Sequence, residues 1–285
     1  MTTRSKLFLM MVLEFFIWGA WLPLIFGYLP SLGFTPGQQS LILNAFPVAS
    51  LVGMFFSNQY ADRNFAGEKF LAFSHAVAGF AILSLAFIAG PTSEQIFQAL
   101  DRDSDGTLGL VEYQEWIRII PSLKDKPEQA EKFFKELDTD KDGHVKAADF
   151  TSESGRKLLE GKPVPNAPFW PFFLLMLVHC LLYVPTISIT NSIAFASMKD
   201  AQEEFGIVRM GGTIGWIAAA WPPVFLLVDW KKVEASGATD LVGKLGAIFD
   251  SPLSGEAMQQ ATSMTYIVAG AASLLLAAFS LTLPH

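Results

Sequence analysis

Two short acidic stretches hold the residues whose types and spacing best suit the binding of a metal ion. Residues 101–112 read DRDSDGTLGLVE, and residues 138–149 read DTDKDGHVKAAD. Each stretch has carboxylates at positions 1, 3 and 5, a glycine at position 6 and a further carboxylate at position 12. Calcium takes about six to eight oxygen ligands, and a twelve-residue loop with this spacing supplies them. We therefore expect two calcium sites.

Both stretches match the loop of the EF-hand, in which the glycine makes a sharp turn and one backbone carbonyl joins the carboxylates as a ligand. The loops begin 37 residues apart, which leaves room for the exiting and entering helices of a pair. The expected ligands of the first loop are Asp101, Asp103, Asp105, the carbonyl of Thr107, and Glu112. Those of the second loop are Asp138, Asp140, Asp142, the carbonyl of His144, and Asp149.

The second loop departs from the usual pattern at two positions. Asp149 is one methylene shorter than the usual glutamate at position 12, and Lys146 places a positive charge at position 9. We therefore expect the first loop to bind calcium more tightly than the second. Leu108 and Val145 occupy equivalent apolar positions in the two loops, so these residues are expected to pair with each other.

The chain as a whole has the composition of a membrane protein. Its mean hydropathy is +0.37, and 16% of its residues are charged, against about 25% in soluble domains. A helix needs about 20 mostly apolar residues to cross the bilayer. Six stretches meet this requirement and predict an all-α, polytopic membrane fold: residues 7–28, 41–60, 70–90, 169–190, 207–228 and 264–283.

The charges divide the chain into three parts. Residues 91–168 hold 16 of the 27 acidic residues and 11 of the 20 lysines and arginines, so they carry a net charge of −5, against −2 for the rest. We expect three transmembrane helices in 1–90, an inserted EF-hand pair in 91–168, and three more helices in 169–285. Residues 229–263 would form an outer loop, in which the apolar run DLVGKLGAIF predicts a short surface helix.

The positive-inside rule, counted over the short loops, predicts the orientation. The outer loop 29–40 holds no lysine or arginine. With the N-terminus inside, the cytoplasmic segments hold Arg4, Lys6, Arg63, Lys69, Lys199 and Arg209. We therefore expect a cell (inner) membrane protein with both termini in the cytoplasm and the EF-hand insert outside it.

Four stretches outside the insert carry a family resemblance. They read FFIWGAWLP at residues 15–23, YADRNFAGEK at 60–69, YVPTISITNSI at 183–193 and FGIVRMGGTIGWI at 205–217. Together they resemble the nucleoside:proton symporter family of the major facilitator superfamily, and the last stretch is the most specific. The resemblance covers the chain apart from the insert and residues 229–262.

The resemblance implies a fold of twelve helices in two six-helix halves, with a substrate site near the middle of the membrane. This chain would supply the N-terminal half, and its partner would be a second six-helix half or a second copy of itself. The transported species would be a nucleoside and a proton, and the lipid bilayer would surround the helices.

The same resemblance points to a substrate site on the fifth helix. Arg209 matches the substrate-site arginine of the family, and Thr213 and Trp216 follow at i+4 and i+7 on the same helix face. Arginine and threonine can hydrogen-bond to ribose hydroxyls or a base edge, and tryptophan offers a surface on which a base can stack. Alternatively, Arg209 is an interfacial arginine and Trp216 packs against helices or lipid.

Glu14, Trp18 and Asn191 complete the candidate substrate site. A charge at membrane depth is costly, so Glu14 is by default a functional residue that binds the proton or the substrate. The alternative is a structural role, with Arg209 as its partner. Trp18 would line the substrate cavity or pack against a neighbouring helix, and Asn191 would line the cavity or form structural hydrogen bonds.

Other function classes find little support. The chain has no Walker A pattern, no G-x-S-x-G and no His/Cys zinc spacing, so we do not expect an enzyme. Its acidic balance argues against nucleic-acid binding. His75 and His179 lie in apolar stretches and are expected to be core histidines rather than proton relays. Two alternatives to transport stay open: a membrane-anchored calcium sensor, and an outer domain that calcium stabilises for docking a partner.

Overall fold

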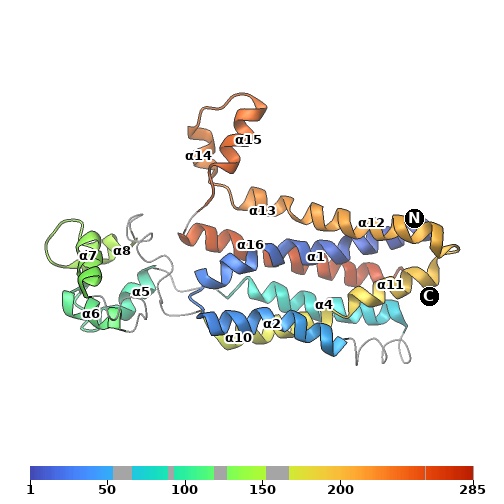
Figure 1. Cartoon of the computed structure of the whole chain (residues 1–285), viewed down its shortest axis with the longest axis horizontal. Coiled ribbons are helices and arrows are strands. Elements are labelled where there is room, and N and C mark those ends of the chain that lie inside the picture. Colours follow the sequence, from blue (N-terminus) through green and yellow to red (C-terminus); the bar gives the residue numbers. More distant parts are fainter. Residues whose placement is uncertain (54–65, 89–92, 119–126, 152–166, 254, 285) are drawn as a thin grey trace. The chain divides into compact units, whose positions relative to one another are not determined.

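The computed structural model describes residues 1–53, 66–88, 93–118, 127–151, 167–253 and 255–284, and the chain divides into two compact units (Figure 1). The first, which we call the membrane unit, comprises Met1–Tyr28, Pro36–Ile88 and Phe169–His285. The second, which we call the EF-hand unit, comprises Leu29–Thr35 and Ala89–Pro168.

The membrane unit is built mainly from apolar helices. Among the described residues, four helical segments are long and apolar enough to cross a membrane: Thr3–Ser31, Gly67–Leu85, Phe169–Ser197 and Ala257–Ser280. The elements are α1 (Thr3–Ser31), α2 (Pro36–Val52), α4 (Gly67–Leu85), α10 (Phe169–Tyr183), α11 (Thr186–Ser197), α12 (Ala201–Ala219), α13 (Trp221–Leu226), α14 (Trp230–Ala235), α15 (Leu241–Phe249) and α16 (Gly255–Ser280).

Helix α4 is central to the packing, because it contacts α10, α11 and α16. Its inner face is buried at His75, Ala78 and Ile82, whereas Phe73 and Phe80 are each 63% exposed. Large apolar side chains that are exposed on an apolar helix suit contact with lipid. The prediction of a multi-pass membrane protein is therefore confirmed, while six spans stay a prediction.

Proline divides two of the predicted spans. The stretch predicted at 169–190 breaks at Pro185, which lies between α10 and α11. The stretch predicted at 207–228 breaks just before Pro222 and Pro223, between α12 and α13. Proline has no N–H to donate and crowds the preceding turn, so each helix is interrupted there.

The segment between α13 and α16 forms a helical hairpin. Asp229 and Asp240 cap the starts of α14 and α15 by accepting hydrogen bonds from backbone N–H groups. Two backbone hydrogen bonds join the ends of this hairpin. The N–H of Asp229 donates to the carbonyl of Ser251 at 2.8 Å, and the N–H of Leu253 donates to the carbonyl of Leu227 at 2.9 Å. The helix predicted from the run DLVGKLGAIF is confirmed as α15.

The EF-hand unit contains the helix–loop–helix pattern twice. Its elements are α5 (Ser93–Leu100), β1 (Thr107–Leu108), α6 (Leu110–Arg118), α7 (Pro127–Leu137), β2 (Val145–Lys146) and α8 (Ala147–Thr151). Strands β1 and β2 pair antiparallel with Leu108 opposite Val145, which confirms the predicted contact between the loops. The buried core around this pair is completed by Phe97, Tyr113, Phe134 and Leu137. The unit thus fixes the two loops side by side.

Candidate functional site

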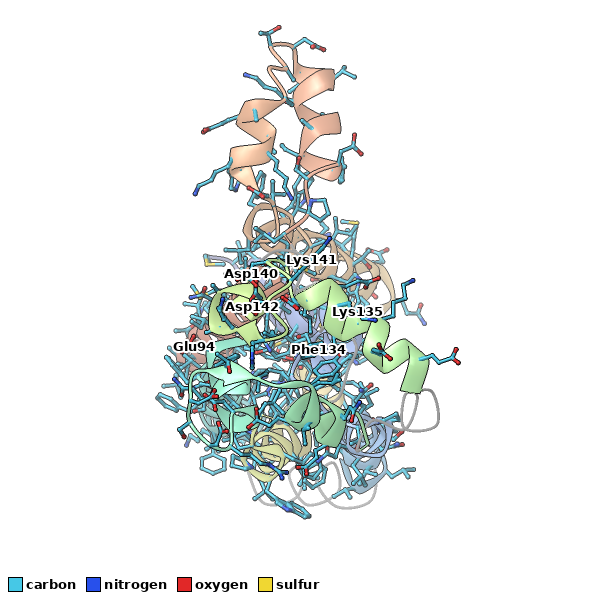
Figure 2. All side chains as sticks on the ribbon, turned by 90° about the vertical axis from the view of Figure 1, so that its left-hand side faces the viewer. Glu94, Phe134, Lys135, Asp140, Lys141 and Asp142 are labelled. Carbon is cyan, nitrogen blue, oxygen red and sulfur yellow. The ribbon has the colours of Figure 1, made fainter. Side chains whose placement is uncertain are left out.

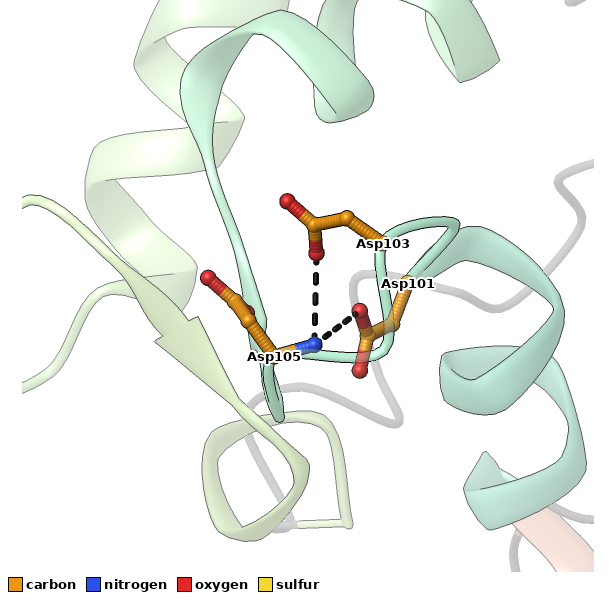
Figure 3. Close-up of side chains that lie close together, drawn as sticks. All are labelled: Asp101, Asp103 and Asp105. Atoms are coloured by element: carbon orange, nitrogen blue, oxygen red, sulfur yellow. Dashed lines mark hydrogen bonds between the residues drawn. The ribbon is translucent and has the colours of Figure 1, made fainter.

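The first loop holds its acidic side chains around its own backbone (Figure 3). Carboxylate oxygens of Asp101, Asp103 and Asp105 all lie within 4.8 Å of one another. The N–H of Asp105 donates to Oδ1 of Asp101 and to Oδ1 of Asp103, both at 3.2 Å. Gly106 turns the chain with a φ of 83°, a conformation that glycine adopts without steric cost. These oxygens fit the ligand set of a calcium ion.

The second loop repeats this geometry. Carboxylate oxygens of Asp138, Asp140 and Asp142 lie within 4.8 Å of one another, and Gly143 turns the chain with a φ of 87°. The N–H of Gly143 donates to Oδ2 of Asp138 at 2.9 Å, and the corresponding bond in the first loop has the same length. The two loops therefore share one acidic framework.

Hydrogen bonds favour the ionised form of one carboxylate in each loop. In the first loop, bonds from the hydroxyl and the N–H of Thr107 lower the pKa of Asp105 below its ordinary value. In the second loop, bonds from the ammonium of Lys146 and from the N–H of His144 lower the pKa of Asp142. An ionised carboxylate is the form that binds a hard cation.

The residue at position 12 has different hydrogen-bond partners in the two loops, because aspartate is shorter than glutamate. Glu112 accepts hydrogen bonds from the N–H of Arg102 at 3.0 Å and from the N–H of Gly109 at 3.2 Å, so both of its oxygens face the loop backbone. Asp149 places one oxygen 3.0 Å from a backbone N–H, but its other oxygen meets the hydroxyl of Thr139. At loop position 2, Glu112 therefore accepts from the backbone N–H of Arg102, whereas the shorter Asp149 accepts from the side chain of Thr139.

Lys146 lies where a cation would bind the second loop. Its ammonium is 2.7 Å from Oδ2 of Asp140 and 2.6 Å from Oδ2 of Asp142, two of the expected ligands, which Figure 2 shows next to each other in this loop. These two hydrogen bonds raise the pKa of Lys146 above its ordinary value, so the side chain stays charged at neutral pH. A calcium ion that binds through these two oxygens must displace the ammonium.

Replacing Lys146 with glutamine is therefore expected to raise the calcium affinity of the second loop about tenfold, because calcium no longer competes with an ammonium. Isothermal titration of calcium into the purified full chain measures this affinity. The control is Lys141→Gln, which removes the same charge from an exposed residue of the same loop. An equal gain in both variants would show that net charge alone sets the affinity.

In the membrane unit, Glu14 lies in a buried polar cluster formed by several helices. Glu14 and His75 are both fully buried, and Oε2 of Glu14 is 2.9 Å from Nε2 of His75. Nδ1 of His75 is 3.0 Å from the hydroxyl of Ser273, and the hydroxyl of Thr186 donates to Oε1 of Glu14 at 2.9 Å. The hydroxyl of Tyr183 donates to the backbone carbonyl of Glu14 at 2.7 Å. Each oxygen of the Glu14 side chain therefore has a partner.

Arg209 belongs to an aromatic cluster formed by α1, α2 and α12, so its suggested pairing with Glu14 is wrong. Its guanidinium carbon lies 4.2 Å from the centre of the Phe15 ring, a cation–π distance. The ring of Trp18 stacks on that of Phe46 and meets that of Trp216 edge-on, with centres 5.1 Å apart in both pairs. The structure thus brings together three of the predicted substrate-site residues.

The remaining two candidates lie in different settings. Thr213 is exposed on α12, between the half-buried Arg209 and Trp216. The amide nitrogen of Asn191 donates to a backbone carbonyl of its own helix, α11, at 3.0 Å. Buried polar atoms normally have partners, yet Oδ1 of Asn191 and the indole N–H of Trp18 have none among the residues that the structure describes. These two atoms can still accept and donate a hydrogen bond.

Glycines allow α12 to approach α1 closely. A Cβ added at Gly215 would lie 2.1 Å from the carbonyl oxygen of Val12, and one added at Gly211 would lie 2.6 Å from that of Phe8. Small residues at such positions let two helix backbones touch. The close contact holds the aromatic residues of the two helices against each other.

An apolar cavity of about 310 Å³ lies between α1, α13 and α15. Its lining includes Gly19 and Leu24 of α1, Val224 of α13, and Phe249 of α15, but neither Arg209 nor the tryptophans of the aromatic cluster. Such a lining offers few groups that could hydrogen-bond to a polar ligand. The cavity is therefore not the site that the sequence predicted.

Sequence reasoning missed four residues that the structure places at these two clusters. Ser273 and Tyr183 contact the buried acid and histidine, and Phe15 and Phe46 contact the aromatic cluster. Their residue types are ordinary in membrane helices. Phe15 and Tyr183 carried one signal, because they open the stretches FFIWGAWLP and YVPTISITNSI on which the family resemblance rests.

Comparisons with known proteins agree with both parts of the chain. A family profile described as nucleoside H+ symporter matches residues 1–100 and 164–251, and one described as an EF-hand domain pair matches residues 92–153. The putative nucleoside transporter YegT of Escherichia coli is 26% identical over 226 residues, which are 79% of this chain and 35% of that protein. The xanthosine permease of Escherichia coli is 31% identical over 85 residues, which are 27% of this chain and 19% of that protein.

Among solved structures, the crystal structure of the nucleoside transporter NupG aligns with a TM-score of 0.34 and 18% identity, covering 100% of this chain and 45% of that chain. The chain spans about a third of the length of YegT. The symporter profile matches on both sides of the insert and covers more than half of the chain. The protein therefore belongs to the nucleoside H+ symporter family, as a multi-pass membrane protein that carries an EF-hand pair.

Proposed function

We propose that this chain is the N-terminal half of a nucleoside:proton symporter and that it carries a calcium-binding EF-hand pair outside the cytoplasm. The observation that supports this most is the symporter match to residues 1–100 and 164–251, with an EF-hand match at 92–153. Six transmembrane helices with both termini in the cytoplasm agree with the distribution of lysine and arginine in the short loops.

The nucleoside site of this proposal is the aromatic cluster around Arg209. A nucleoside needs a flat apolar surface for its base, which Trp18 and Trp216 supply, and hydrogen-bonding groups for its ribose, which Arg209 and Thr213 supply. The indole N–H of Trp18 and Oδ1 of Asn191, which have no partners among the described residues, add a donor and an acceptor. This combination of stacking and polar groups is what a nucleoside requires.

The partner of this half is a second six-helix half or a second copy of the chain. In a transporter of two halves, each half lines one side of the substrate site. The half-buried Arg209 and the exposed Thr213 would present the polar side of such a shared site.

A second function is favoured by the EF-hand unit itself. Both of its loops hold their carboxylates in an arrangement that suits calcium, and this arrangement needs no transport site. A membrane-anchored calcium-binding protein without transport activity would require only that unit and its anchor. It would have no need of Arg209, Trp18 and Trp216 in one cluster, so we place it second.

Uptake of labelled uridine and adenosine into proteoliposomes with a proton gradient tests the first function. We expect uptake by the full chain to exceed that of empty liposomes, and Arg209→Ala to lower it about tenfold or more, since about 1.4 kcal/mol of substrate binding is lost. Arg4→Ala removes an exposed arginine near the start of α1 and is expected to leave uptake unchanged. Folded chain that binds calcium yet takes up neither nucleoside would mean that it needs a separate second half or that it is the calcium-binding anchor, and uptake would then be measured with that second half present.

A further inference from the structure

We propose that Glu14 and His75 together form a proton-binding site, in which the hydroxyls of Ser273 and Thr186 reorient as the proton arrives and departs. This inference rests on the proposed symport function and assigns a location to the coupled proton. The four residues come from α1, α4, α16 and α11, so the site joins four helices of the membrane unit. All four side chains are fully buried.

The hydrogen bonds of Ser273 fix one proton of the pair. A serine hydroxyl has a single hydrogen, and that of Ser273 is donated to the backbone carbonyl of His75 at 2.9 Å. The Ser273 oxygen therefore accepts from Nδ1 of His75, 3.0 Å away, so Nδ1 carries a hydrogen. A second hydrogen lies between Nε2 and Oε2 of Glu14, which are 2.9 Å apart. Whichever of these two atoms holds it, the pair has no net charge.

The same atoms can form a second complete set of hydrogen bonds with one proton fewer. If the Nδ1 proton leaves, the hydroxyl of Ser273 can turn away from the backbone carbonyl and donate to Nδ1. Nε2–H then donates to the Glu14 carboxylate, whose Oε1 still accepts from Thr186. The reaction is therefore neutral pair to anionic pair plus one proton, and it leaves every side-chain nitrogen and oxygen of the pair bonded.

Thr186 has the same freedom at the other end of the site. Its hydroxyl faces Oε1 of Glu14 and the backbone carbonyl of Tyr183, and it has one hydrogen to give. If Oε1 carries the proton, that oxygen can donate to Thr186, and the hydroxyl can turn fully to the carbonyl. Both flanking hydroxyls thus have a choice of acceptor, which lets the site accommodate more than one protonation state.

Few other titratable groups surround the pair in the part of the chain that the structure describes. The ring of Tyr183 lies 5.8 Å from the histidine ring of the pair, edge to face, and the ring of His179 stacks on Tyr183 at 5.2 Å. Cys180 is buried on the same helix, α10. Arg209 of α12 lies over Phe15, the residue that follows the acid of the pair. A change of one charge in the pair would therefore occur next to a residue of the aromatic cluster that we assign to the nucleoside.

Nuclear magnetic resonance of the full chain in lipid bilayers, with ¹⁵N-labelled histidine rings, tests the proposal directly. The sequence has four histidines, so the His75 signals are assigned by their loss in His75→Gln. We expect Nδ1 of His75 to lose its hydrogen in one step between acidic and alkaline pH, whether the ring starts as an imidazolium or as the neutral Nδ1–H form. In Glu14→Gln this step is expected to disappear, because an amide cannot offset an imidazolium and the ring stays neutral.

Substitutions at two serines of α16 distinguish a proton-binding role of the pair from a purely structural one. Ser273→Ala is expected to change the proton concentration at the midpoint of the His75 step about tenfold or more, because Nδ1 loses its partner. Ser280→Ala removes an equally buried hydroxyl, which bonds the carbonyl of Leu276 within its own helix, and is expected to leave the step unchanged.

A hydrogen on Nδ1 of His75 that is kept at every pH, or a step that is the same in Glu14→Gln and in the unaltered chain, would overturn the proposal. This failure is distinguishable from failure of the proposed function, because the spectra need no nucleoside. If the pair titrates but the chain transports nothing, the proposed symport function is wrong and the proposed proton site still stands.

Discussion

Replacing Glu112 with glutamine is expected to lower the calcium affinity of the first loop about a hundredfold. Both carboxylate oxygens of Glu112 already face the loop, where they accept hydrogen bonds from the N–H groups of Arg102 and Gly109. The amide keeps the shape of the side chain but has one oxygen and no charge, so it cannot bind the ion bidentately. A loss of about 3 kcal/mol of charge-assisted binding corresponds to that change in affinity.

The matched control for this change is Glu115→Gln, in the same helix α6. The carboxylate of Glu115 bonds the side chain of Arg102 rather than the loop backbone, so this variant removes an equal charge without removing a ligand. Calorimetric titration of the full chain in detergent is expected to show a change of about threefold or less. Equal weakening in both variants would mean that the charge of the whole unit, rather than position 12, determines the affinity.

The calcium loops could be predicted from the sequence because their geometry is local. The residues that shape each loop lie within twelve positions, and the turn at Gly106 or Gly143 follows from one residue type. The pairing of Leu108 with Val145 follows from the equivalence of the two loops. Local spacing of this kind survives without any knowledge of the rest of the fold.

The contact of Lys146 with two ligand carboxylates could not be predicted from the sequence. Spacing shows that a positive charge stands at position 9 of the second loop, and it does not show the direction of a long, flexible side chain. The structure places the ammonium on Asp140 and Asp142. The expected weakness of the second loop thereby gains a specific cause, which is competition for two of its ligands.

The polar cluster of the membrane unit depends on contacts that one sequence does not contain. Glu14 was a candidate because a carboxylate is costly in an apolar helix, but its partners lie 61 residues away at His75 and 172 residues away at Thr186. Helix packing decides those contacts, and helices that are apolar on all sides do not reveal which face is inward. Arg209 was the chemically reasonable partner, and its cation–π contact with Phe15 places it elsewhere.

Replacing Gly215 with alanine is expected to destabilise the membrane unit by about 3 kcal/mol, the upper end for overpacked sites. The new Cβ would lie 2.1 Å from the carbonyl oxygen of Val12 and 3.0 Å from its Cα. These are backbone atoms, so no rotamer change relieves the clash, and α12 must move away from α1. That movement separates Trp18 from Trp216, so nucleoside binding is expected to weaken together with stability.

Gly206→Ala provides the matched control, because it adds the same methyl group to the same helix at a position with nothing within 4 Å. Alanine favours a helix over glycine by about 1 kcal/mol, so this variant is expected to keep or slightly raise the thermal stability of the chain. Thermal unfolding in detergent, followed by tryptophan fluorescence, compares the two. An unchanged melting temperature in Gly215→Ala would show that α1 and α12 are not in close contact, and the aromatic cluster would then lose the support on which the proposed nucleoside site depends.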